Sequence, residues 1–115
     1  KAGVFTIAIT SVAYSSAETS RHSCGKRLFE VSDLVIDNHG RIGDAELEIE
    51  GFAGRVSPTS TVTGAAIINA VCAEAAALFV RCGIEPPVFK SANVDGGDEY
   101  NARVLEKYRE FITYL

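Results

Sequence analysis

The chain has 115 residues and a mass of 12.3 kDa, which is the size of one domain. Apolar residues make up 47% of it and charged residues 23%, and this balance excludes a wholly disordered chain. Lys and Arg number 11 and Asp and Glu number 15, which gives a net charge of −4. A net acidic chain is poorly suited to binding nucleic acid, because that binding depends on clustered cations.

The first third of the chain predicts two buried strands joined by a polar connection. Residues 4–9 are a short, β-branched apolar run, typical of a strand that is covered on both faces in a parallel sheet. Residues 14–23 are rich in hydroxyl side chains and predict a loop, and residues 25–32 can form two helical turns. Residues 34–36 predict a second buried strand, which ends in a turn.

The middle of the chain predicts one exposed strand and one long helix. Residues 45–49 alternate between apolar and acidic side chains, as in a half-exposed strand at the edge of a sheet. Residues 51–58 predict a loop. Thr59 or Ser60 is then expected to cap a helix that ends near Cys82, because a glycine follows there.

The last third predicts a short strand at residues 88–89, a turn at residues 93–97 and an amphipathic helix capped by Asp98. This order of elements favours an α/β fold with a parallel sheet. It supplies about one and a half strand–helix–strand units, whereas a stable sheet of this kind normally needs about two. We therefore expect the chain to be part of a longer protein and to lack its amino-terminal half.

The long helix is almost entirely apolar over residues 62–80 and nearly long enough to span a bilayer. A membrane span is not expected, because Asn69 and Glu74 are costly in lipid and the many alanines are only weakly hydrophobic. We expect this helix to be buried on most sides, either within the domain or at a subunit contact.

The chain has three cysteines, an odd number without the spacing of a zinc site. We expect buried, reduced thiols, as in a cytoplasmic protein. No metal or other cofactor is expected.

Three hydroxyl-rich segments carry the candidate binding chemistry. They comprise Thr10 and Ser11 after the first strand, Ser20 in the following loop, and Thr59, Ser60 and Thr61 at the start of the long helix. Ligands of open α/β sheets bind beyond the strand ends, and a helix N-terminus offers unpaired N–H groups that suit a phosphate. Arg21, Lys26 and Arg27 add cations. Ordinary helix capping is the alternative, since Ser and Thr cap helices widely.

Four segments of the chain resemble the carboxyl-terminal half of SIS (sugar isomerase) domain proteins. They are Thr-Ser-Arg-His-Ser-Cys-Gly-Lys-Arg-Leu at 19–28, Asp-Leu-Val-Ile-Asp-Asn at 33–38, Pro-Thr-Ser-Thr at 58–61, and Pro-Pro-Val-Phe at 86–89 together with residues 91–99. The run Asn-Val-Asp-Gly-Gly-Asp-Glu within the last segment is the most specific part. More narrowly, the segments resemble an uncharacterised bacterial branch of phosphosugar-binding proteins.

This resemblance implies a three-layer α/β/α, flavodoxin-like domain with a parallel sheet, of which residues 1–115 would form a single partial SIS domain. It implies a sugar phosphate as the ligand and a homo-oligomer, a dimer or tetramer, with sites near subunit contacts. Some SIS proteins are aldose–ketose isomerases and others only bind. The expected function is therefore phosphosugar binding. If the chain is also catalytic, the expected reaction is aldose–ketose isomerisation of a sugar phosphate.

Isomerisation moves a proton between adjacent carbons and needs a positioned base. His22 is one candidate, because it lies among hydroxyls and cations. Glu50, at the end of the acidic alternation, is the other candidate, and Glu48 is comparable. Exposure to solvent on a loop or a strand face is the alternative interpretation of all three.

Two other functions remain open at this point. A non-catalytic phosphosugar-sensing or regulatory module would share the anion site but lack the base. A dimerisation element would act through the alanine-rich helix instead. Neither a nucleic acid nor a membrane is an expected partner.

Overall fold

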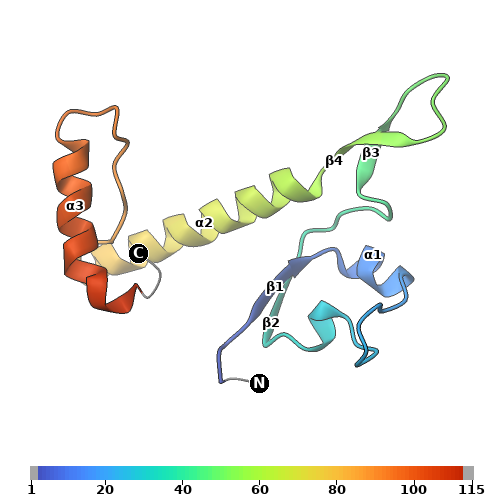
Figure 1. The fold of residues 1–115 in the computed structure, drawn as a ribbon, viewed down its shortest axis with the longest axis horizontal. Coiled ribbons are helices and arrows are strands. Elements are labelled where there is room, and N and C mark those ends of the chain that lie inside the picture. Colours follow the sequence, from blue (N-terminus) through green and yellow to red (C-terminus); the bar gives the residue numbers. More distant parts are fainter. Residues whose placement is uncertain (1–2, 113–115) are drawn as a thin grey trace. The chain divides into compact units, whose positions relative to one another are not determined.

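The computed structural model describes residues 3–112 (Figure 1). Its elements in chain order are β1 (Ile7–Thr10), α1 (Val12–Ala17), the 3-10 turn η1 (Leu28–Glu30), β2 (Leu34–Asp37), β3 (Ala45–Glu48), β4 (Arg55–Pro58), α2 (Ser60–Arg81), α3 (Gly97–Tyr108) and the 3-10 turn η2 (Arg109–Phe111). They divide into two compact units, one reaching Ala70 and the other starting at Val71, so that α2 contributes to both.

β1 and β2 form a parallel pair, in which Ile7 lies opposite Leu34 and Thr10 opposite Asp37. Ala8, in the middle of β1, is 2% exposed and is the one buried apolar side chain among the residues described. The connection between the two strands contains α1 and η1, as a parallel pair requires. The carboxyl ends of β1 and β2 therefore lie side by side.

β3 and β4 form a separate antiparallel pair, in which Ala45 lies opposite Pro58 and Leu47 opposite Val56. The alternating pattern predicts β3 correctly. The prediction of a loop over residues 51–58 is wrong for its last four residues, which form β4. A proline argues against a strand inside a sheet, but Pro58 is tolerated because both strands of a two-stranded sheet are edge strands.

The prediction of a three-layer α/β/α, flavodoxin-like parallel sheet, the SIS fold, is wrong. Across residues 3–112 the strands make one parallel pair and one antiparallel pair. A layered sheet needs several parallel strands between helices. Here only two apolar runs pair in parallel, and the third strand pairs with the segment that follows it in the chain.

The short helical segments of the first unit differ from the prediction. α1 runs from Val12 to Ala17, so its last four residues lie in the region, residues 14–23, for which hydroxyl-rich residues predict a loop. The Ser11 side chain accepts the N–H of Tyr14 at 3.1 Å and so caps this helix, which is the role that a Ser favours. The two helical turns expected over residues 25–32 are reduced to the single turn η1.

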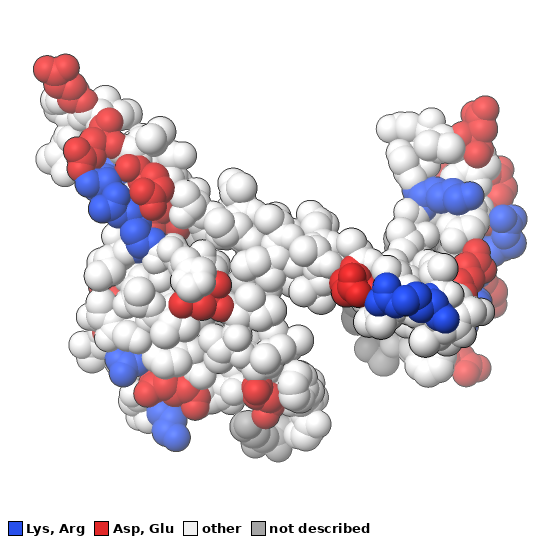
Figure 2. All heavy atoms as spheres, turned by 180° about the vertical axis from the view of Figure 1, so that it is seen from behind, with Lys and Arg blue, Asp and Glu red and all other residues white. Residues whose placement is uncertain are grey.

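α2 runs from Ser60 to Arg81, close to the predicted limits, and Gly83 follows it in the left-handed conformation with φ +71°. Burial of this helix within the domain, one of the two predicted alternatives, is wrong for residues 3–112, since none of the residues of α2 is buried. Burial at a subunit contact stays a prediction. Its surface is almost free of charged side chains (Figure 2). By length and composition alone, α2 could cross a membrane.

The cysteines also differ from expectation. Cys24, Cys72 and Cys82 are free, as predicted, but all three are exposed rather than buried. Two of them lie on or directly after α2, so their exposure follows from the exposure of that helix.

α3 is amphipathic as predicted, with Val104 and Tyr108 half-buried on one face. The helix begins at Gly97, which is buried. A Cβ atom there would clash with the carbonyl oxygen of Ser91, so the packing of this loop requires a glycine. Residues 88–89 do not form the predicted strand.

Candidate functional site

A cavity of about 770 Å³ lies at the carboxyl ends of β1 and β2. The end of β1 with α1, the loop after α1, the loop after β2 and the first residue of α2 line it. The Asn38 N–H donates to the Thr10 carbonyl at 3.0 Å and holds the two strand ends together. Ligands of parallel strands bind at such strand ends, so this cavity is the candidate site.

Hydroxyl and amide groups make up much of the cavity wall. Three residues predicted from the sequence line it together: Thr10, Ser11 and Ser60. Tyr14 and Asn38 line it as well, and neither is among the residues predicted from the sequence. Asn38 could have been found, because it lies two residues after the predicted parallel strand at residues 34–36.

Ser11 is part of the framework of the cavity. Its side chain is 9% exposed, donates its hydroxyl hydrogen to the Gly40 carbonyl and accepts the N–H of Tyr14. These bonds join the start of α1 to the loop after β2. Ser11 therefore fixes the position of two walls and has no hydroxyl hydrogen left for a ligand.

Three arginines line the cavity, and they differ in how far their charge is neutralised. Arg27 pairs with Glu30, with Nε and Oε2 3.1 Å apart, and Arg41 pairs with Glu46, with Nη1 and Oε2 3.3 Å apart. Arg21 takes part in none of the ion pairs formed between residues 3 and 112. Its guanidinium is thus the uncompensated cation of the site.

Asp44 occupies the N-terminus of α2. It adopts the left-handed conformation with φ +62°, which Asp tolerates better than most residues. Its carboxylate accepts the Ser60 hydroxyl at 2.5 Å, the Ser60 N–H at 2.9 Å and the Thr59 N–H at 3.2 Å. The sequence predicts an anion at the start of this helix, and the anion found there is the chain's own carboxylate.

These hydrogen bonds hold the pKa of the Asp44 carboxyl below its usual value, and the bond from the Ser60 hydroxyl has the largest effect. A lowered pKa stabilises the folded chain above the ordinary pKa of Asp, about 3.9, and this contribution is lost as the pH falls through the lower, folded-state value.

We expect acidification below about pH 4 to weaken α2. The variant Asp44→Asn should already have a weakened α2 at pH 7, and its helix content should respond less to acid. Circular dichroism at 222 nm during a titration from pH 7 to pH 2.5 measures both effects. Asp95→Asn, in a loop of the other unit, is the matched control. Its signal at 222 nm should change with pH as that of the unmodified chain does.

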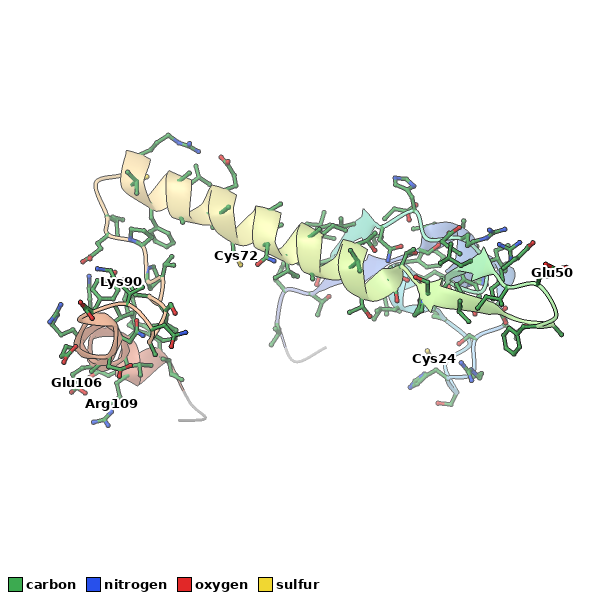
Figure 3. The ribbon with its side chains drawn as sticks, turned by 90° about the horizontal axis from the view of Figure 1, so that it is seen from above. Cys24, Glu50, Cys72, Lys90, Glu106 and Arg109 are labelled. Atoms are coloured by element: carbon green, nitrogen blue, oxygen red, sulfur yellow. The ribbon has the colours of Figure 1, made fainter. Side chains whose placement is uncertain are left out.

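Two predicted residues of the loop after α1 do not line the cavity. The Ser20 hydroxyl donates to the Lys26 carbonyl at 2.9 Å and so closes the loop on itself. His22 is exposed, with its Nδ1 2.9 Å from the Cys24 sulfur, and Cys24 lies out on this loop (Figure 3).

Three further predicted residues also lie outside this cavity. Thr59 and Thr61 flank Ser60 at the start of α2. Glu50 lies in the turn between β3 and β4 and borders a separate hollow on that hairpin (Figure 3). The carboxylates that do line the main cavity are Glu18 and Asp44. Within residues 3–112, no group of three or more His, Cys, Asp or Glu side chains is placed to hold a metal.

The chain is similar to several bacterial proteins named UPF0309. It is 55% identical over 113 residues to the UPF0309 protein of Geobacillus thermodenitrificans, a match covering 98% of this chain and 45% of the relative. It is 50% identical over 112 residues to the UPF0309 protein of Streptomyces coelicolor, a match covering 97% of this chain and 45% of the relative. It is 47% identical over 113 residues to the UPF0309 protein of Shouchella clausii, a match covering 98% of this chain and 46% of the relative.

The chain thus spans less than half the length of the curated relatives it matches. No family model matches the chain. The relatives carry the UPF0309 name and nothing in these comparisons points to a SIS domain, so the assignment to the SIS family is wrong. The comparisons show that nearly the whole of this chain is similar to UPF0309 proteins.

Proposed function

We propose that the cavity at the ends of β1 and β2 binds a phosphorylated sugar. The observation that carries this proposal is Arg21, an uncompensated guanidinium lining a cavity whose wall is rich in hydroxyls. A guanidinium donates two parallel hydrogen bonds to a phosphate, and Arg21 forms no ion pair within residues 3–112 that would compete for them.

The remaining wall suits the polyol part of such a ligand. Sugar hydroxyls both donate and accept hydrogen bonds. Tyr14 offers a phenolic hydroxyl and Glu18 a carboxylate, while Asn38 uses its side-chain oxygen to accept the Gly40 N–H at 3.0 Å and keeps its amide hydrogens for a ligand. A volume of about 770 Å³ is also within the usual range for small-molecule sites, about 300–1,000 Å³.

The geometry supports binding more directly than isomerisation. Neither His22 nor Glu50 lines the cavity, and Asp44 is held by the start of α2. Glu18 is the remaining cavity carboxylate and would be the base of an isomerase at this site. Exchange of solvent deuterium into the carbons next to the sugar carbonyl distinguishes the two functions, because a module that only senses the sugar produces none.

Calorimetric titration of the chain with fructose 6-phosphate, fructose and inorganic phosphate tests the proposal. We expect fructose 6-phosphate to bind more tightly than either of its parts. Thr10→Val keeps the volume of the side chain and removes one neutral hydrogen bond, so it should weaken binding about 2- to 10-fold. Thr61→Val is the matched control, because Thr61 does not line the cavity. Equal binding of fructose and its phosphate, or equal loss in both variants, would contradict the proposal.

A further inference from the structure

We propose that the apolar surface of α2 is the docking site of a further polypeptide segment, the counterpart of the part of the UPF0309 proteins that lies outside their match to this chain. This inference does not depend on the proposed sugar-phosphate site. It rests on the surface of α2 and on the length of the relatives.

The exposed apolar side chains of α2 lie on more than one of its sides. Val71 is 49% exposed and Val80 is 64% exposed. They are nine residues apart (80 − 71), about two and a half turns at 3.6 residues per turn, and so project from opposite sides of the helix. Leu78, about two turns from Val71, adds to that side and is 51% exposed. A helix that is apolar all round belongs in a protein interior.

A second copy of this chain does not suffice as the cover. A symmetric pair of helices would cover one side of each α2 and leave the opposite side in water. The relatives provide a larger partner, since the match covers 45% of the Geobacillus thermodenitrificans protein and leaves 55% (100 − 45) outside it. A segment of that size can cover both sides of a helix.

A lipid bilayer is also a poor match for this surface. Glu74 forms an ion pair with Arg81, with Oε1 and Nη2 2.7 Å apart, and Asn69 lies about one and a half turns further toward the start of the helix. Charged and amide groups are costly inside a bilayer. At a protein contact they can be hydrogen-bonded, and the alanines of α2 let another backbone approach closely.

The test is to express this chain together with the part of the Geobacillus thermodenitrificans relative that lies outside the match. We expect a stable one-to-one complex, measured by light scattering. Cys72 lies on α2 and is exposed (Figure 3), so it reports whether the helix is covered. In a variant with Cys24→Ser and Cys82→Ser, maleimide labelling of Cys72 should slow by about 10-fold or more in the complex. In a variant that keeps only Cys24, the rate should change by less than about 2-fold.

Val71→Asp should abolish the complex, because it places a charge on the covered surface, whereas Glu74→Gln on the same helix should retain it. Val71 is exposed in the chain alone, so its replacement leaves the internal packing of the chain intact. Four results would each overturn the inference: no complex, equal binding by both variants, concentration-dependent protection of Cys72 in the chain alone, which indicates a second copy, or protection by phospholipid vesicles only.

Discussion

Arg21→Gln is expected to weaken the binding of fructose 6-phosphate by about 10- to 150-fold. A hydrogen bond to a charged group contributes about 1.5–3 kcal/mol, and every 1.4 kcal/mol is tenfold in affinity. The effect should be large because Arg27 and Arg41 already pair with carboxylates, which leaves Arg21 as the principal partner of the phosphate. Calorimetric titration at low salt measures the change.

Lys26→Gln is the matched control for this experiment. Lys26 lies in the same loop and its replacement removes the same charge, but it does not line the cavity. We expect Lys26→Gln to change the affinity by less than about 2-fold, since the interaction of an exposed charge at a distance is screened by salt. If both variants lose affinity equally, the loop attracts anions only through its overall charge and the assignment of Arg21 is wrong.

The elements that the sequence predicts well are those whose evidence is local. α2 is a long apolar run between a hydroxyl cap and a glycine, and β3 alternates with a period of two. The first strand, expected at residues 4–9, is found at Ile7–Thr10, and the second is extended by one residue to Asp37. Errors of this size are usual at the ends of predicted elements.

The parts that were not predicted depend on distant contacts. β4 exists because it pairs with β3, and its own residues include a proline that speaks against a strand. Asp44 reaches Ser60 across 16 positions of sequence, and nothing in its neighbours indicates that it caps α2. The resemblance to SIS domains relied on segments rich in Gly, Pro, Ser and Asp, which turns and caps of many folds share.

The residues of the candidate site also divide into those that local sequence predicts and those that depend on distant contacts. Thr10 and Ser11 could be placed because residues that follow a parallel strand face its ligand edge, and that rule applies equally to Asn38. Arg41 could not be placed, because the path of the loop after β2 decides which side chains reach the cavity. His22 and Glu50 are predicted from their chemistry and from segments that could border a pocket, and the structure places both outside the cavity.

Ser11→Ala is expected to lower the free energy of unfolding by about 1–3 kcal/mol, because it leaves the Gly40 carbonyl and the Tyr14 N–H without their partner in a part-buried position. Urea denaturation followed by circular dichroism measures the loss. Ser16→Ala, in the same helix but exposed, should change the stability by less than about 0.5 kcal/mol.

The same variant separates a framework residue from a ligand-binding one. Because the hydroxyl hydrogen of Ser11 is already donated to Gly40, its removal should reduce the affinity of the folded protein for fructose 6-phosphate less than Thr10→Val does. Titration at a temperature where both variants are folded makes the comparison. A larger loss of affinity in Ser11→Ala, with unchanged stability, would show that Ser11 binds the ligand directly and that its bond to Gly40 gives way when the sugar phosphate enters.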